Sequence, residues 1–427
     1  MSENRDVVLV TVDCWRHDAV DRMQGLREWS ADEDVVQTDA ICQSSATNGV
    51  FPSILSSTHY FEAYNQAGGL SDDVVPLAEV LSDAGYTTGG FVASNPHLQK
   101  WAGSFNHFRN GTLSDVGDGA DDGPDTSLGQ YASDLLALQK RVPGRRLLKR
   151  ALEWYRDQSG PRFLWLHLMD PHTPYHPGIR KATDVGLVRS YLAAVRFLVA
   201  LKRNMRTFDD LHPLWKRQLE RMHWACVENV DRTLADALPQ VDDDATVVLM
   251  GDHGENLEED PFRHGKLYDT QVRVPLFVRW TLDHDFGEPA SVRQMDLAPT
   301  IAEAVTGTTP SAWEGAPLPQ EAPRPSNTVH HASRLDRVFV GHRTDCGKLI
   351  ANLDFDTGIE QDREYYDLQD DPIETNNRYG TGEDVPPEME SALDDFVERV
   401  QSGSSFAESG SGGEAATKRL KELGYLS

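Results

Sequence analysis

An acid and an imidazole stand side by side in the segment VVLMGDHGEN, directly after a run of apolar residues. Asp252 offers a hard oxygen and His253 a ring nitrogen, and this pair of ligands suits a divalent cation. Gly251 and Gly254 allow the backbone to turn tightly around them. The segment therefore predicts part of a metal site, with a purely structural turn as the alternative.

Two further polar residues occupy positions where a strand ends or a helix begins. Asp13 closes the run VVLVTVD, and a carboxylate there faces the crevice in which a sheet binds ligands, unless it only caps a helix. Thr47 precedes a predicted helix start in SSATNGVFPSILSS, with Pro52 in the first turn. Free N–H groups and the positive end of the helix dipole would stabilise an anionic ester beside its hydroxyl. An ordinary capping role is the alternative for Thr47.

Two loops add histidines and a lysine. The segment FLWLHLMDPHTPYHP places Asp170, His172 and His176 in a proline-broken loop after another predicted strand. The segment FRHGKLYDTQVRVPL places His264 and Lys266 beside a glycine before the next one. Such groups hold the anionic oxygens of a substrate or protonate a leaving group. Taken alone, each loop is equally compatible with a plain polar surface.

These residues need a scaffold that brings several strand ends together. Apolar, β-branched runs predict buried strands at 7–12, 88–92, 163–168, 246–250 and 274–278. Helical periodicity lies between them at 75–84, 128–157, 188–238 and 297–305. This alternation predicts an α/β fold with a mostly parallel central sheet sandwiched by helices. Ligands gather at the carboxyl ends of such strands, where the polar residues above fall.

The pattern changes near residue 326. Short alternating segments at 328–332, 337–343 and 348–353 predict a smaller C-terminal antiparallel sheet, covered by a helix at 387–400. We therefore expect a catalytic domain at 1–325 and an antiparallel subdomain at 326–400. A Gly/Ser-rich linker at 401–414 and a short terminal helix at 415–427 would follow.

The charge balance excludes one class of partner. The chain has 68 acidic and 41 basic residues, a net charge of −27, which repels the phosphates of nucleic acids. Acid spread along the chain, with arginine far commoner than lysine, predicts a halophilic protein adapted to concentrated salt.

No apolar run approaches membrane-spanning length and no signal peptide is recognisable, so we expect a cytoplasmic protein. The four cysteines form neither a zinc-ligand pattern nor a disulfide framework.

In chain order, these segments resemble the sulfatase family of the alkaline-phosphatase superfamily. VVLVTVDCWRHD resembles the opening metal-binding strand of the family. GYTTGGFVASN, FLWLHLMDPHTPY, GDHGE, HGKLYD with VRVPL, and MDLAPTI resemble later blocks. EYYDLQDDPIETNN and the final KRLKELGYL resemble its C-terminal signatures. The resemblance runs over nearly the whole chain and implies an α/β sandwich with a smaller C-terminal sheet.

The resemblance also implies roles for single residues. It implies that Asp13, Asp252 and His253 bind a divalent metal ion, with Mn, Zn, Ca or Mg as the candidates. It places the nucleophile at Thr47, whose oxygen we expect the same cation to bind.

A second set of roles concerns the substrate. The resemblance implies that His172, His264 and Lys266 are substrate-binding or acid/base groups, and we group Asp170 with them. His264 would protonate the departing alcohol. A second metal ion is left open, with His264, Asp170 and either His172 or His176 as its ligands.

Two positions depart from the family pattern. Typical sulfatases carry C/S-x-P-x-R, in which the first residue is oxidised to formylglycine, whereas this chain has Thr47 and Phe51 at its ends. Cys14 follows Asp13 where the family often has a second acid. An unmodified threonine nucleophile is similar to that of the phosphodiesterases and phosphotransferases of the superfamily.

We therefore expect a hydrolase of sulfate or phosphate (di)esters that works through a covalent Thr47 intermediate. Its substrate would be a small anionic ester, with glycan- and lipid-linked esters as candidates. One alternative is a phosphotransferase that passes the group to an alcohol. The other is a catalytically inactive relative that binds an anion or glycan. The sequence predicts no oligomeric state.

Overall fold

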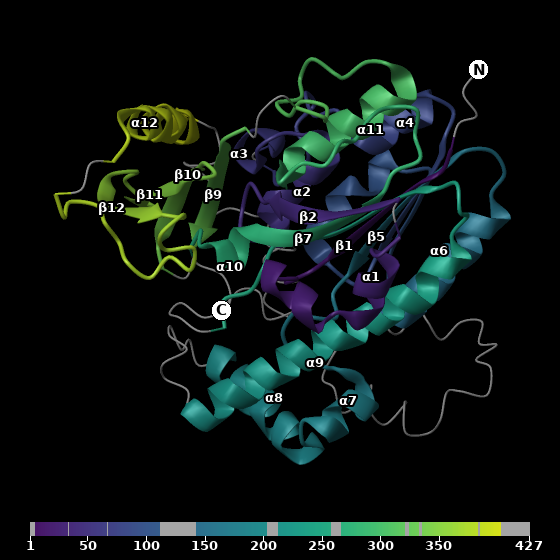
Figure 1. Cartoon of the computed structure of the whole chain (residues 1–427), viewed down its shortest axis with the longest axis horizontal. Helices are drawn as coiled ribbons and strands as arrows, with labels where there is room; N and C mark the ends of the chain where they lie inside the picture. The colour runs from purple at the N-terminus through teal and green to yellow at the C-terminus, as the bar shows by residue number, and fades with distance from the viewer. Residues whose placement is uncertain are drawn as a thin grey trace.

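The central strands are apolar along their whole length because both faces of their sheet are covered. The computed structural model describes residues 5–32, 34–65, 67–111, 142–202, 212–257, 266–320, 324–332, 335–382 and 385–402. Within these residues, eight strands form the main sheet in the order β4-β3-β5-β1-β6-β7-β2-β8 (Figure 1). Their bounds are β1 (Val7–Val12), β2 (Val35–Ile41), β3 (Thr87–Val92), β4 (His107–Asn110), β5 (Arg162–Leu168), β6 (Thr246–Gly251), β7 (Arg273–Arg279) and β8 (Ser291–Arg293).

The sheet is mostly parallel, which confirms the predicted fold class. Strand β7 runs antiparallel to its neighbours, β6 and β2, while the other strand pairs of the described sheet are parallel. The predicted strands lie within β1, β3, β5, β6 and β7. Strands β2, β4 and β8 were not predicted, because β2 is interrupted by half-exposed polar residues and the other two are short edge strands.

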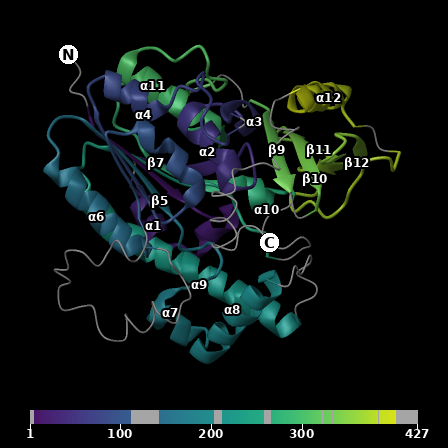
Figure 2. The same ribbon diagram turned by 180° about the vertical axis from the view of Figure 1, so that it is seen from behind.

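Helices cover both faces of the sheet (Figures 1 and 2). One face carries α2 (Thr47–Ser56), α4 (Leu77–Asp83) and α11 (Leu297–Thr306), and the other carries α1 (Gln24–Trp29), α6 (Gly144–Asp157) and α9 (Pro213–Ala237). Because successive side chains of a strand point to opposite faces, Val7 and Leu9 of β1 enter the first core, and Val8 and Val10 enter the second.

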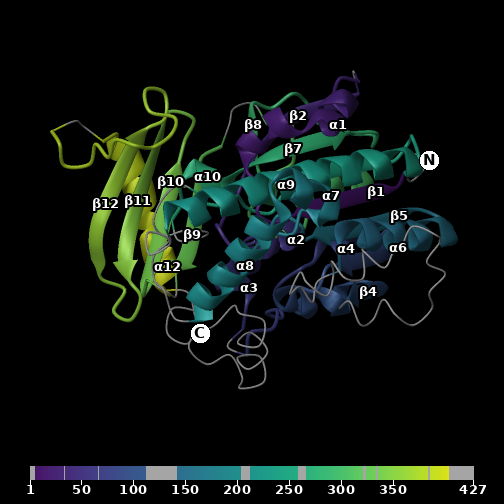
Figure 3. The ribbon, with the colours of Figure 1, turned by 90° about the horizontal axis from the view of Figure 1, so that it is seen from below.

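Two further helices pack against α9. The helical region predicted at 188–238 contains α8 (Leu187–Lys202) and α9, which pack against each other and against α7 (Gly178–Asp184) (Figure 3). Of the helix predicted at 128–157, the described part is α6, and 128–141 lies outside the described residues. Within the described ranges, no helix combines the length and apolarity needed to cross a bilayer.

The second sheet is antiparallel, as predicted, in the order β12-β11-β10-β9. Its strands are β9 (Ser326–Ala332), β10 (Arg337–Arg343), β11 (Gly347–Asp354) and β12 (Glu360–Asp367), and α12 (Pro387–Ser402) covers one face. Strand β12 was not predicted, since most of its residues are polar and its first three are exposed. The boundary at 325/326 stays a prediction that the start of β9 supports. The predicted linker and terminal helix lie almost wholly outside the described residues.

A buried ionic network joins the second sheet to the segment before β7. Lys348 on β11 is 1% exposed, and its Nζ lies 2.5 Å from Asp269 Oδ1 and 2.6 Å from Glu374 Oε1. Arg343 on β10 donates to both oxygens of Asp269 at 3.1 and 2.9 Å. Although burial opposes the charge, Lys348 and Arg343 hold the pKa of Asp269 well below its usual value. This buried charge cluster therefore connects the second sheet to the main sheet, in addition to the apolar contacts between them.

Candidate active site

Two carboxylates meet at the carboxyl edge of the main sheet. Val12 pairs with Gly251 on one side of β1 and with Leu168 on the other, so the three strands end at the same level. The ladder continues beyond them, with Asp13 N–H donating to Leu168 O at 2.8 Å and Asp252 N–H to Val12 O at 3.0 Å. Both aspartates are completely buried. The predicted meeting of Asp13 and Asp252 follows directly from this parallel register.

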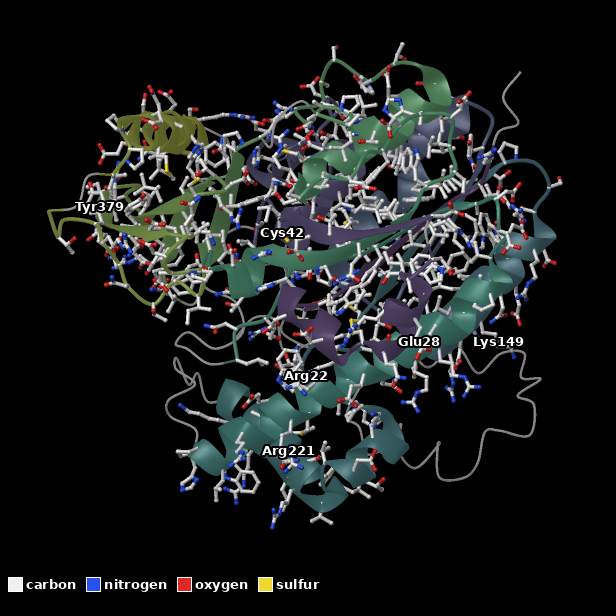
Figure 4. All side chains as sticks on the ribbon, viewed as in Figure 1. Arg22, Glu28, Cys42, Lys149, Arg221 and Tyr379 are labelled. Atoms are coloured by element: carbon white, nitrogen blue, oxygen red, sulfur yellow. The ribbon has the colours of Figure 1, made fainter. Side chains whose placement is uncertain are left out.

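The loop before α2 is hydrogen-bonded to the residue that precedes β7 and to strand β9 of the second sheet. Cys42 N–H donates to Val272 O at 2.8 Å, and Val329 N–H of β9 donates to Gln43 O at 2.9 Å. Cys42, labelled in Figure 4, lies inside the molecule at the end of β2, and its thiol donates to Asp252 O at 3.2 Å. These contacts fix where α2 begins.

Thr47 is the first residue of α2, and Ala46 is its N-cap. The Thr47 hydroxyl does not cap the helix. It lies 3.3 Å from Asp13 Oδ2 and 3.3 Å from His253 Nε2. The first turn of α2 also packs closely on the loop before it, because a Cβ at Gly49 would lie 2.3 Å from Ser44 Oγ. The helix start therefore presents the hydroxyl to the two strand ends.

Pro52 lies inside α2 rather than in its first turn. It has no N–H to donate to Asn48 O, four residues earlier, and so opens the helix ladder at that point. The hydroxyl of Tyr64 supplies the missing hydrogen bond, at 2.6 Å. The turn that carries Thr47 is thus held from outside the helix.

The protonation of His253 follows from its partners. Its Nδ1 lies 2.7 Å from Gly254 O, and a carbonyl only accepts, so Nδ1 carries the proton. In a neutral ring the Nε2 lone pair then faces Thr47. The same atom lies 3.7 Å from Asp13 Oδ1 and 3.7 Å from Asp252 Oδ2. Lone pairs that converge in this way surround a cation in metal sites.

The carboxylates themselves fit a divalent ion. Asp252 Oδ2 is buried and has no hydrogen-bond partner among the described residues. Burial and the charge of Asp13 raise the pKa of Asp252 well above its usual value. Although burial opposes its charge, His172, His167 and His253 hold the pKa of Asp13 well below its usual value. A divalent cation would let both carboxylates ionise in one place, so the donor set fits such an ion.

Cys14 gives Asp13 a neutral donor where the family often has a second acid. Its Sγ lies 2.9 Å from Asp13 Oδ1, and its backbone N–H donates to Asp252 Oδ1 at 3.3 Å. Burial, together with Asp13, raises the pKa of the thiol well above its usual value. Without a bound metal ion, Cys14 is therefore a thiol that donates to Asp13.

His172 reaches this cluster, whereas Asp170 does not. A ring nitrogen of His172 lies within 4.8 Å of the ligand atoms of Asp13 and Cys14. Both oxygens of Asp170 instead accept from Gly144 N–H, at 3.1 and 2.9 Å, and cap the start of α6. His176 is half-buried further along the same loop.

Lys266 is paired with the second sheet. Its Nζ donates to Glu364 Oε1 at 3.0 Å and to Tyr268 Oη at 2.7 Å. Glu364 belongs to β12, so this pair connects the segment before β7 with the subdomain. His264 lies outside the described residues.

Three residues near Thr47 escaped the sequence analysis. His167, on β5, has its Nε2 at 3.7 Å from Asp13 Oδ2. His97 and Lys100 lie on the 3₁₀ segment η2 (Pro96–Ser104), and Lys100 Nζ donates to Asn48 Oδ1 at 3.0 Å. The only sequence signal for His167 is a lone histidine in an apolar strand. For the other two it is a His–Lys pair three residues apart, which is common on surfaces.

These positions define a class of site: a hydroxyl at a helix start, beside carboxylates and imidazoles that can bind a metal at the edge of an α/β sheet. The family model described as Sulfatase matches residues 5–308. The chain belongs to the sulfatase family. Its members hydrolyse sulfate or phosphate esters and generally bind a divalent metal, which supports an ester hydrolase in general terms.

Solved structures show the same fold. The protein BT4656, in complex with its substrate D-glucosamine-2-N,6-O-disulfate, has a TM-score of 0.70 at 16% identity, covering 94% of this chain and 99% of that one. The phosphonate monoester hydrolase of Agrobacterium radiobacter has a TM-score of 0.66 at 15% identity, covering 93% and 95%. Comparison with curated protein sequences finds no match.

Proposed function

We propose that this protein is a metal-dependent hydrolase that cleaves sulfate or phosphate (di)esters through a covalent ester on Thr47. The proposal depends above all on one observation, the position of Thr47 Oγ1 at 3.3 Å from both Asp13 and His253. A divalent cation bound by Asp13, Asp252 and His253 would lower the pKa of the Thr47 hydroxyl and polarise the ester.

In the first step, Thr47 Oγ1 loses its proton to solvent and forms a bond to the sulfur or phosphorus atom. The bond from that atom to the leaving alcohol breaks, and the alcohol takes a proton from His264. In the second step, water gives a proton to His264 and its oxygen forms a bond to the sulfur or phosphorus atom of the Thr47 ester. The bond from that atom to Thr47 Oγ1 breaks, the acid anion leaves, and Thr47 Oγ1 takes a proton from solvent, so both residues return to their starting state. His172, Lys266 and the N–H groups at the start of α2 would offset the charge on the remaining oxygens.

Of the two solved structures named above, one is described in complex with its substrate, a sulfated sugar, and the other is named a phosphonate monoester hydrolase. We extend the proposal to a small anionic ester carried by a sugar or lipid. The net charge of −27 argues against nucleic acid as a partner. We keep the cytoplasm as the proposed compartment, and the four free cysteines support it.

Nitrophenyl esters test the proposal. We would compare sulfate, phosphate monoester, phosphate diester and phosphonate turnover in high salt with Mn, Zn, Mg or Ca. Thr47→Ala should abolish turnover of the best ester, whereas Thr47→Ser should retain part of it because a hydroxyl remains. Thr308→Ala, at an exposed position, is the control.

The outcomes separate the alternatives. Unchanged turnover in Thr47→Ala would refute the covalent mechanism. Metal binding without turnover of any ester would favour an inactive relative, and transfer of the group to added alcohols would favour a phosphotransferase. The preferred ester decides between sulfate and phosphate chemistry.

A further inference from the structure

His167 lies against Asp13 without a part in the mechanism above. The residue is fully buried on β5, and its Nε2 is 3.7 Å from Asp13 Oδ2 with no hydrogen-bond partner among the described residues. Its Nδ1 lies 3.0 Å from Thr11 Oγ1 on the neighbouring strand β1. A buried imidazole needs partners for both nitrogens, so the position of its proton is a physical question.

A row of polar groups leads to Nδ1. Trp165 Nε1 can only donate, and it donates to Thr11 Oγ1 at 3.1 Å. The single proton of Thr11 can then go to His167 Nδ1 or to Leu166 O, which is 3.1 Å away. The parallel ladder between β1 and β5 already provides peptide N–H donors to the carbonyls of β5, as Asp13 N–H does for Leu168 O. The Thr11 hydroxyl is therefore expected to donate its hydrogen bond to His167 Nδ1 rather than to Leu166 O.

With Nδ1 accepting, the ring proton must be on Nε2, the atom that faces Asp13. The row then begins at Trp165, which only donates, and ends at an ionised carboxylate, which only accepts. Each group between them receives one hydrogen bond and donates one. In this order the last donor, His167 Nε2, faces an acceptor, Asp13 Oδ2, at 3.7 Å.

Aromatic contacts hold the ring in this orientation. Phe51 of α2 meets His167 edge to face, with ring centroids 5.0 Å apart and an interplanar angle of 87°. Phe51 also packs on Trp165 at 5.1 Å. The helix that carries Thr47 therefore also restricts the rotation of His167.

We propose that His167 is a positioning residue that donates its Nε2–H to Asp13 Oδ2. Cys14 Sγ donates to the other oxygen of the same carboxylate. With a donor on each oxygen, the plane of Asp13 is fixed relative to Thr47 and Asp252 before a substrate arrives. The inference rests on the proposed function only in taking Asp13 as a metal ligand.

The wild-type chain tests the proton position directly. Selective ¹⁵N labelling of histidine in the full-length, metal-free protein, with His167→Gln to assign the signals, reports which ring nitrogen carries the proton. Protonated Nε2 is the expected result. A proton on Nδ1, with an Nε2 signal that shifts on addition of Zn²⁺, would instead make His167 a metal ligand and overturn the proposal.

Metal affinity gives a second readout that needs no turnover. Titration with Mn²⁺, followed by the electron paramagnetic resonance of the free ion, should show a loss of about 10- to 100-fold for His167→Asn, whose amide is too short to reach Asp13. His167→Gln places an amide nitrogen near the position of Nε2 and should keep the affinity close to that of the wild type. His107→Gln, on the edge strand β4, is the control.

Thr11→Val, a nearly isosteric change, keeps the test decisive if a His167 variant fails to fold. It removes the donor to Nδ1 and should lower Mn²⁺ affinity in the same direction as His167→Asn. Unchanged affinity in both Thr11→Val and His167→Asn would overturn the inference. If Thr47→Ala keeps full turnover while His167→Asn loses Mn²⁺, the proposed function fails and this inference stands.

Discussion

Lys100 carries a positive charge to the residue that follows Thr47. Its ammonium group donates to Asn48 Oδ1 and lies 3.6 Å from the centre of the Tyr64 ring. Burial lowers the pKa of Lys100 to about 8. A cation held in this way is suited to an anionic oxygen of the substrate, and it would replace the arginine that the family has where this chain has Phe51.

The lowered pKa of Lys100 predicts a pH effect on substrate binding. The amine is charged below pH 8 and neutral above it, so the KM for an anionic ester should rise as the pH passes about 8, instead of near the usual lysine value of about 10.4. Lys100→Met should have a raised KM that no longer changes across this window. Lys149→Met, on the exposed face of α6, is the control, and a pH-dependent KM in Lys100→Met would contradict the role.

The site was predictable most directly where the backbone alone decides the position. Asp13 and Asp252 follow paired parallel strands, so their meeting can be expected from the sequence. Asp170 and Lys266 were grouped with the site from their loops, and their roles there stay predictions, but the sequence did not indicate the contacts with Gly144 N–H and Glu364 that the structure shows. Those partners are distant in the sequence, so no local sequence pattern predicts these contacts.

At the scale of elements, the start of α6 depends on a residue from the loop after β5. The helix has no capping side chain of its own at Pro143, and Asp170 accepts from Gly144 N–H instead. A Cβ at Gly144 would lie 2.6 Å from Asp170 Oδ2, so the contact requires glycine. Asp170 thereby joins the helix to the loop that carries His172.

Removing this cap should reduce stability and leave metal binding intact. Asp170→Ala should lower the free energy of unfolding by about 1 kcal/mol, and Asp170→Asn by less, because the amide oxygen still accepts. Urea unfolding measures the change. The Mn²⁺ affinity should stay at the wild-type value, and a loss of affinity in Asp170→Asn would return Asp170 to the metal site.

The main strands were predictable for the same reason that they are stable. Complete burial of β1 and β6 leaves a continuous apolar run in the sequence. The strands that were missed, such as β4 and β12, lie at sheet edges, where exposure removes the apolar signal. These strands pair with other segments of the chain, so local patterns of apolar residues do not predict the pairing.

At the scale of the whole molecule, like charges repel one another across the surface. A net charge of −27 opposes the compact state, and salt screens this repulsion. We expect the thermal unfolding midpoint to rise as KCl increases from dilute buffer to molar concentration. The increase should shrink near about pH 4, where many exposed carboxylates are protonated. A stability maximum in dilute buffer would contradict the halophilic interpretation.

Phe51 also constrains how this protein could evolve. The ring is fully buried between the sheet and α2, in contact with Trp165 and His167. A single mutation that restored the arginine of the C/S-x-P-x-R pattern would bury an unpaired guanidinium, at a cost of several kcal/mol out of a total stability of about 5–15 kcal/mol. A lineage with this core cannot return to that pattern one substitution at a time. Selection would first have to remodel the wall behind the nucleophile.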